Sequence, residues 1–342
     1  MKKHKICKIL LVILAIFLCV AFYELLGICV AYKKQPEVSN TTKKETKNGS
    51  WNECSENTER AVIIEKNPEA LLQRVRLIKN AKKEIILSTF AFQSDESGKL
   101  ILGALHDAAD RGVHIRLLVD GMESWIDMEG NPYFYGLSSH ENVEIKLYNK
   151  ANPLKPWKMM GRMHDKYLIA DGKRYILGGR NTYNYFLGDF PGHKNYDRDV
   201  LVVCDEPEKE NSVNQLLEYF ETIWEQEDSG YFHDNKKLAN RKSVKNAVLE
   251  LQNGYQKYFE ENKERICDTD YTDETFETEK IALVSNPIHT GSREPVVWYQ
   301  LGELMKNAKN RVKIHTPYII CNDMMYNTWE EIAAVSYTHL RA

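Results

Sequence analysis

The chain has 342 residues, a formal net charge of −3 and a charged fraction of 28%. This length predicts one large or two medium domains, and a hydrophobic fraction of 43% is enough for a packed core. Proteins that bind nucleic acid are more often basic, so the net charge argues against that class of partner. Seven cysteines without a Cys-x-x-Cys pair support neither a zinc site nor a disulfide framework.

The N-terminus predicts a membrane anchor. A basic tail at residues 1–8 precedes an apolar stretch at 9–32 that only Glu24 interrupts. As a helix this stretch would be about 36 Å long, enough to cross a bilayer and longer than the apolar part of a signal peptide. A small-x-Ala sequence at 29–31 leaves cleavage open, but an uncleaved anchor is favoured. The basic tail favours a body outside the cytoplasm.

The next segments predict a linker and then an alternating fold. Residues 33–60 are rich in Lys, Glu, Thr and Asn, which is typical of a polar linker. From 61 to 226 helical and strand patterns alternate, with helices expected at 68–82 and 98–111 and strands at 84–92, 113–119 and 143–148. This rhythm predicts an α/β fold with a mixed, mostly parallel sheet flanked by helices.

The stretch HDKYLIADGKRYILGGRN at 164–181 carries the candidate catalytic residues. His164, Lys166 and Asp171 stand at H-x-K-x4-D, and a Gly-Gly-x-Asn sequence ending at Asn181 follows. Two short apolar runs around the Asp171-Gly172 pair predict a β-hairpin, which would project His164 and Lys166 together. Phosphoryl transfer without a metal needs a nucleophile, a positive charge and neutral donors at one phosphate, and these side chains supply them.

This segment resembles the signature of the phospholipase D superfamily, and GVHIRLLVDG at 112–121 resembles a strand of the same family. The resemblance covers roughly residues 61–333 and is strongest to bacterial cardiolipin synthases. It implies a phospholipase D-like fold of two pseudo-repeats whose motifs meet in one active site, with a covalent phosphohistidine. His164 would be the nucleophile, and Asp197 or Asp199 would be the carboxylate that orients its imidazole. Asp171 would support the hairpin. The residues implied at the substrate phosphate are Lys166, Gly179 and Asn181.

Only one H-x-K-x4-D motif is present, although the chain contains signs of a repeat. Residues 77–89 and 304–316 align without a gap at an offset of 227, which places a second motif histidine near position 391. We therefore expect a first repeat at 61–226, a charged linker with a helix at 241–264 within 227–279, and an incomplete second repeat at 280–333. The last residues, 334–342, are expected to be a non-native tail.

The resemblance implies a phosphatidyltransferase that joins phosphatidylglycerol to an alcohol acceptor, without metal or other cofactor. Its partners would be the anionic phospholipid, the acceptor and the membrane, and no nucleic acid. The full-length protein would act as a monomer, held by a single-pass anchor in a bacterial cell membrane with its catalytic domain outside the cytoplasm. The sequence as given is expected to be inactive, because the second histidine would protonate the leaving alcohol.

Two other functions remain open at this point. One is a phospholipase D-type phosphodiesterase or nuclease, in which two copies of the chain complete the site. The other is a non-enzymatic scaffold or lipid-binding module, which the intact H-x-K sequence argues against. The loop at 149–163, basic and with Trp157, suits an anionic lipid headgroup about as well as it suits solvent.

Overall fold

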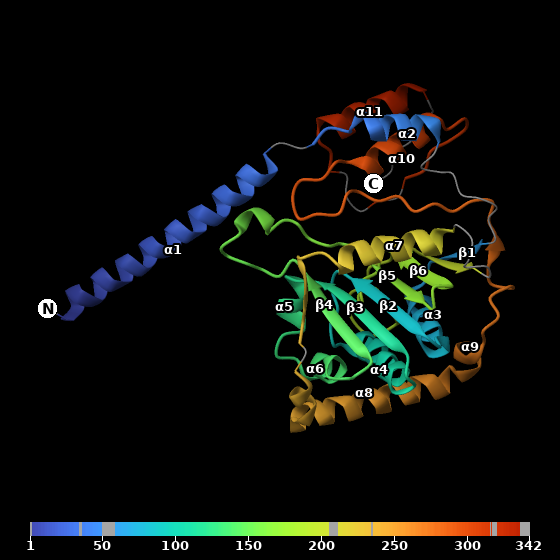
Figure 1. Cartoon of the computed structure of the whole chain (residues 1–342), viewed down its shortest axis with the longest axis horizontal. Coiled ribbons are helices and arrows are strands. Elements are labelled where there is room, and N and C mark those ends of the chain that lie inside the picture. Colours follow the sequence, from blue (N-terminus) through green and yellow to red (C-terminus); the bar gives the residue numbers. More distant parts are fainter. Residues whose placement is uncertain are drawn as a thin grey trace.

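The computed structural model describes residues 2–33, 36–49, 59–204, 211–233, 235–314, 316 and 320–335 (Figure 1). Within these residues the strands form one sheet in the order β8-β4-β3-β2-β5-β6-β7-β1-β9. The strands are β1 Glu59–Ile64, β2 Glu84–Thr89, β3 His114–Asp120, β4 Val143–Tyr148, β5 Tyr167–Ala170, β6 Arg174–Gly178, β7 Asp199–Cys204, β8 Ser229–Tyr231 and β9 Phe276–Glu277. The helices are α1 Lys2–Tyr32, α2 Asn40–Asn48, α3 Asn67–Asn80, α4 Glu96–Asp110, α5 Glu123–Asp127, α6 Pro132–Ser138, η2 Pro156–Lys158, α7 Ser212–Trp224, η3 Lys236–Asn240, α8 Lys242–Glu261, α9 Lys263–Cys267, α10 Val296–Lys306 and α11 Asp323–Val335.

The sheet is mixed and flanked by helices, as predicted, but it is not mostly parallel. β2 pairs in parallel with β3, and β3 with β4. The other pairings between the described strands are antiparallel, including those of β5 with β2 and with β6. The cause lies in the connections. Helices link β2, β3 and β4, whereas a three-residue turn links β5 to β6, and so short a turn joins only antiparallel strands.

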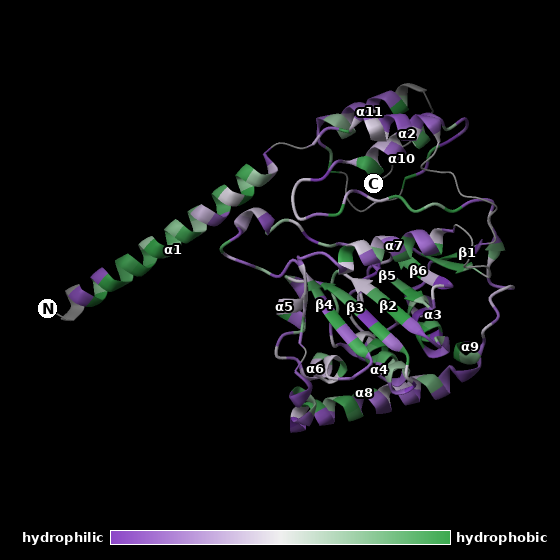
Figure 2. Ribbon diagram, in the orientation of Figure 1, coloured by the Kyte–Doolittle hydropathy of each residue, from purple (hydrophilic) through white to green (hydrophobic). Residues whose placement is uncertain are grey.

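Each face of the sheet has its own apolar core. On one face α3, α4 and α6 cover the strands and α8 lies outside them, whereas α7 covers the other face (Figure 1). Phe220 and Trp224 of α7 pack with Ile169 and Val202 of the sheet. Strands buried on both faces are apolar along their length, and Figure 2 shows apolar residues along these strands and throughout α1.

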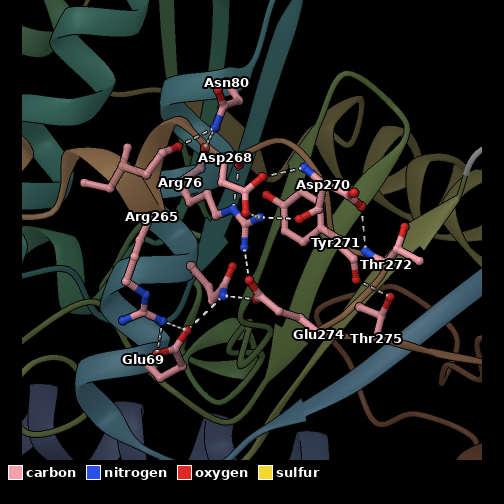
Figure 3. Close-up of polar contacts among 12 residues, drawn as sticks. Glu69, Arg76, Asn80, Arg265, Asp268, Asp270, Tyr271, Thr272, Glu274 and Thr275 are labelled. Atoms are coloured by element: carbon pink, nitrogen blue, oxygen red, sulfur yellow. Dashed lines mark hydrogen bonds and ion pairs between the residues drawn. The ribbon is translucent and has the colours of Figure 1, made fainter.

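The described residues of 227–279, which were expected to form a linker, pack onto the helices that cover the sheet. They include α8, which is the helix expected at 241–264 and which contacts α4 and α6. After α9 the chain returns along α3, where the buried Arg76 donates to the carbonyl oxygens of Asp268 and Asp270 and to the Glu274 carboxylate (Figure 3). The charges that predicted a linker are therefore partly hydrogen-bond partners of α3.

The two ends of the chain contain three helices that pack together and one that projects away. α1 projects from the body (Figure 1), and its residues 5–32 are long and apolar enough to cross a membrane. The described part of 33–60, expected to be a linker, contains α2, whose Thr42 hydroxyl donates to Glu294 at 2.7 Å just before α10. The rings of Trp298 in α10 and Trp329 in α11 are 5.3 Å apart.

The predicted repeat is matched by a helix but not by a strand. Shifting α3 by 227 residues gives 294–307, and α10 covers most of that range. The described residues within 311–316 form no strand. Positions 336–342 of the expected tail lie outside the described residues, so the second repeat, the tail and the division into domains stay predictions.

Candidate active site

His164 and Lys166 precede a β-hairpin in the middle of the sheet. β5 and β6 pair antiparallel as predicted, with Tyr167 opposite Leu177. Asp171 and Gly172 have φ angles of 55° and 62°, the left-handed backbone typical of an Asp-Gly pair in a tight hairpin turn, and Lys173 completes the connection to β6. β2 pairs with β5 and β7 pairs with β6, so neighbouring strands hold the hairpin on both sides.

The side chains of His164 and Lys166 meet, as their spacing along the chain predicts. Lys166 Nζ lies 2.8 Å from His164 Nδ1 and donates to the His164 carbonyl oxygen at 2.7 Å. Phe90, which follows β2, places its ring centroid 4.6 Å from that of the imidazole and 5.4 Å from Lys166 Nζ. The imidazole keeps access to solvent, whereas only 5% of Lys166 is exposed. The accessible imidazole of His164, the candidate nucleophile, is thus in contact with the buried Lys166.

The surroundings adjust the charge of both groups. Desolvation lowers the pKa of His164, and the positive charge of Lys166 lowers it further. The imidazole is therefore neutral at pH 7, as a nucleophile must be. Desolvation also lowers the pKa of Lys166 to about 8, against the raising effect of the Asp165 and Asp197 charges. Lys166 is consequently still cationic at pH 7 but loses its charge in mildly alkaline solution.

Asn181 and Gly179 lie just after β6, on the way out of the hairpin. Asn181 is buried, and its Oδ1 accepts a hydrogen bond from the Ala91 N–H at 3.2 Å. This contact fixes the amide plane, so the NH2 group is its donor side. A Cβ atom at Gly179 would lie within 2.7 Å of the Asp197 carboxylate. A serine at position 179 would therefore require the Asp197 side chain to move.

The two carboxylates proposed to orient the imidazole have different surroundings. Asp199 is buried and its Oδ2 lies 2.9 Å from Arg74 and 3.2 Å from Arg180. Asp197 is half-buried beside Gly179 and its charge acts on Lys166. Within the described part of the chain, neither carboxylate hydrogen-bonds to the His164 ring. Because the Asp199 carboxylate already pairs with two arginines, Asp197 is the better candidate to orient the His164 imidazole.

Asp120 is a residue of this region that the sequence alone did not single out. It is buried at the carboxyl end of β3, where it accepts from the Met163 N–H at 3.0 Å and pairs with Arg162 at 3.1 Å. Burial raises its pKa, and Arg162 opposes that effect. Asp120 thereby fixes the two residues immediately before His164. Its position after a parallel strand was the available signal, because sites gather at such strand ends.

A cavity of about 300 Å³ opens beside the His164–Lys166 pair, between β5, β6, α7 and residues 283–297. Tyr219 of α7 donates to Asp165 in its wall at 2.8 Å. Burial raises the pKa of both groups, and the charge of Arg293, also in the wall, lowers both. The cavity therefore combines two basic side chains with an acid that burial disfavours as an anion, which suits an anionic phosphate group.

Asp171, by contrast, lies at the far end of β5 from His164. Its carboxylate accepts from the N–H groups of Lys82, Lys83 and Glu84 at 2.7 to 3.1 Å, where β2 begins. The structure therefore does not bring Asp171 to the histidine. Its contacts join the hairpin turn to the neighbouring strand, in agreement with the supporting role expected for it.

Replacing Asp171 with alanine is expected to lower the free energy of unfolding by about 1–3 kcal/mol, because three backbone donors lose a charged acceptor. Asp171→Asn keeps an acceptor oxygen and tolerates the left-handed backbone, so it should lose less. Thermal unfolding in detergent micelles measures both. If Asp171→Ala keeps the stability of the unmodified protein but loses activity, Asp171 instead takes part in the reaction.

Residues 74–224 match the family described as the cardiolipin synthase, phospholipase D-like domain. Cardiolipin synthase C of Escherichia coli strain K12 is 29% identical over 171 residues, which are 46% of this chain and 34% of that protein. Cardiolipin synthase 1 of Staphylococcus aureus strain MRSA252 is 34% identical over 117 residues, 34% of this chain and 23% of that protein. The crystal structure of phosphatidylserine synthase from Haemophilus influenzae Rd KW20 shares the fold, with a TM-score of 0.53 at 16% identity over 86% of this chain and 63% of that one.

The match to the family covers most of the segments that build the site, but not the cavity wall at residues 283–297. It runs from α3 to the end of α7 and includes the hairpin, the cavity wall of α7 and the carboxylates after β6. The chain spans between about a quarter and about a half of the length of the curated relatives that it matches. Residues 74–224 of the chain therefore form a phospholipase D-like domain.

Proposed function

We propose that the chain carries the first half-site of a membrane-anchored phosphatidyltransferase of the cardiolipin synthase type, with His164 as its nucleophile. The observation that carries the proposal is the contact of a neutral imidazole with a buried lysine at the mouth of a cavity. A second support is the family match over residues 74–224. The helix at residues 5–32 would hold this site at the membrane that contains the substrate.

In the first step, His164 Nε2 attacks the phosphorus of phosphatidylglycerol, and the bond from phosphorus to the leaving glycerol oxygen breaks. Attack by Nε2 requires the ring proton on Nδ1, the atom that Lys166 contacts in the structure. We therefore infer that Lys166 Nζ turns from Nδ1 to a phosphate oxygen when substrate binds. Asp197 then accepts the hydrogen bond from Nδ1–H, and Asn181 donates to a second phosphate oxygen.

In the second step, the hydroxyl of an acceptor alcohol attacks the phosphatidyl-histidine and the phosphorus–nitrogen bond breaks. The leaving glycerol oxygen needs a proton in the first step, and the acceptor must lose one in the second. We assign both transfers to the histidine of the second motif, which the repeat predicts near position 391. With phosphatidylglycerol as acceptor the products are cardiolipin and glycerol.

The same geometry supports hydrolysis as a second candidate function. If water replaces the acceptor alcohol, the product is phosphatidic acid, and a phosphodiester of nucleic acid offers the same reacting atoms. The net charge of −3 and the apolar helix α1 favour the lipid. That the chain acts on no nucleic acid therefore stays a prediction, and the assay must include nucleic acid to test it.

The test is to express the complete gene product in membranes with labelled phosphatidylglycerol and to identify the products. We expect labelled cardiolipin from the unmodified protein and none from Asn181→Ala or Asp197→Ala at comparable protein levels, because both substitutions remove proposed site groups. Phosphatidic acid as the main product would replace transfer by hydrolysis. Cleavage of added DNA in preference to lipid would overturn the proposal.

The rate of transfer should fall on the alkaline side of neutrality. Lys166 is cationic below its pKa of about 8 and neutral above it, so the phosphate loses its main positive contact as pH rises through that value. kcat/KM reports the ionisation of the free enzyme and should show this limb. Lys166→Arg keeps its charge at every working pH and should remove the limb, although with a lower rate. If kcat/KM of Lys166→Arg still falls on the alkaline side, the ionisation of another group causes the fall.

A further inference from the structure

The C-terminal turns of α1 contact two loops that adjoin the His164 cavity. The Tyr23 hydroxyl donates to the Leu154 carbonyl oxygen at 3.1 Å, in the loop at 149–163 that leads into His164. The Tyr32 hydroxyl donates to the Thr290 carbonyl oxygen at 2.8 Å, in the segment whose Arg293 lines the cavity. The apolar helix therefore hydrogen-bonds to the loops around the site, in addition to being joined to the body by the chain.

Two glycines allow close packing at these contacts, because a side chain at either position would collide with a neighbouring segment. A Cβ atom at Gly27 would lie 2.8 Å from Pro156 Cβ, and one at Gly161 would lie 2.7 Å from Thr290 Cα. Contacts this short do not occur in folded proteins, so both positions require glycine for the observed packing. We call the contacts of Tyr23, Gly27 and Tyr32 with the two loops the anchor junction.

The same packing covers the charged residue of the apolar helix. Glu24 lies three residues before Gly27 and so on the same face of α1. Both of its carboxylate oxygens are covered, and they have no hydrogen-bond partner among the described residues. An ionisable group inside a membrane span is costly where it faces lipid. The junction therefore lets α1 present its apolar sides to lipid and its one acidic side chain to protein.

The basic residues of the loop at 149–163 point mainly to internal partners, not to an external ligand. Lys158 pairs with Asp228 at 2.6 Å, Lys150 donates to a backbone carbonyl oxygen, and Arg162 pairs with Asp120. Three large apolar side chains of the loop are exposed, together with Lys155: the exposed fraction is 77% for Leu154, 45% for Trp157 and 59% for Met160. We call these three side chains the loop tip.

The length of α1 places the loop tip at a definite depth. Residues 5–32 form a helix about 42 Å long, which equals the thickness of a bilayer with its headgroups. Gly27 lies about 8 Å along the axis before Tyr32, which is near the boundary between headgroups and hydrocarbon. The loop packed against Gly27 must share that depth, where tryptophan is favoured.

We propose that the anchor junction inserts the loop tip into the headgroup boundary of the lipid bilayer, so that the His164 cavity adjoins the membrane surface. The inference rests on the proposed membrane anchoring of α1, not on the identity of the reaction. The partner is the bilayer itself, recognised by apolar side chains at fixed depth. α1 thereby fixes the distance between lipid phosphate and His164.

The test uses the full chain in vesicles of phosphatidylcholine and phosphatidylglycerol, with bromine on acyl carbons near the headgroup in one preparation. Bromine quenches tryptophan fluorescence at short range, and Trp157→Phe isolates the contribution of Trp157 from the other tryptophans. We expect strong quenching of Trp157 in the brominated vesicles. Gly27→Leu should reduce quenching to the level of Trp157→Phe, whereas Ala21→Leu, which introduces the same side chain at an exposed position of the same helix, should not.

Equal fluorescence of Trp157 in brominated and plain vesicles would overturn the proposal, and so would full quenching in Gly27→Leu. A separate arm keeps this outcome distinct from the fate of the proposed function. His164→Ala should retain the quenching because the imidazole is not part of the junction. Quenching of Trp157 in a protein that transfers no phosphatidyl group would leave the insertion standing and remove the proposed reaction.

Discussion

Replacing His164 with alanine is expected to reduce phosphatidyl transfer by the complete gene product roughly a thousandfold or more, because the covalent step loses its nucleophile. The position of Lys166 should change little, since the lysine also donates to the backbone carbonyl oxygen of residue 164. A label-transfer assay in membranes measures the rate, and circular dichroism compares the folding of the two proteins.

The matched control is His193→Ala, which removes an exposed imidazole that contacts Asn195 and Tyr185 and does not line the cavity. This variant should keep the unmodified rate. If both variants keep their activity, the H-x-K sequence at 164–166 is not the catalytic centre. If both lose it together with their folded structure, the loss in His164→Ala no longer supports a catalytic role.

Asp199→Asn is expected to lower the free energy of unfolding by about 3–5 kcal/mol, the range found when one partner of a buried ion pair is removed. The substitution keeps the shape of the side chain but leaves Arg74 and Arg180 without a negative charge between them. The effect reaches the site as well, because Arg180 also donates to the carbonyl oxygens of Ile64, Glu65 and Asp197. Denaturant or thermal unfolding in micelles measures the change.

Glu65→Gln provides the control for this prediction. Glu65 pairs with Arg198 at 3.1 Å, but both side chains are more than half exposed. Exposed pairs contribute about 0–1 kcal/mol, so this variant should unfold almost like the unmodified protein. Equal losses in the two variants would mean that the burial of Asp199 is not what makes its charge important.

The sequence predicted the local part of the site well. The hairpin around Asp171-Gly172 and the meeting of His164 with Lys166 both follow from residue spacing within one strand and one turn. The choice between Asp197 and Asp199 did not follow, because it depends on Arg74, which comes from α3 more than a hundred residues earlier. Asp120 was missed for the same reason, since its partners Arg162 and Met163 are distant in sequence.

The fold predictions failed where a pattern had two explanations. Alternating helices and strands predicted a mostly parallel sheet, but no α-helix lies between β4 and β7, where a short turn and two loops connect the strands. The charge-rich residues 227–279 predicted a linker, yet carbonyl and carboxylate groups of residues 268–274 within it surround the buried Arg76. Composition cannot distinguish a charge that faces solvent from one that meets a partner brought near by the fold.

The central claim is that His164 becomes covalently attached to the phosphatidyl group, and isolation of that adduct tests it most directly. The complete gene product is incubated with phosphatidylglycerol carrying a radioactive phosphorus, stopped in alkali, digested and analysed by mass spectrometry. We predict label on the peptide that contains His164, stable in alkali and lost in acid, as expected of a phosphorus–nitrogen bond. Label on no residue, or on a residue outside the two motif histidines, would contradict the account.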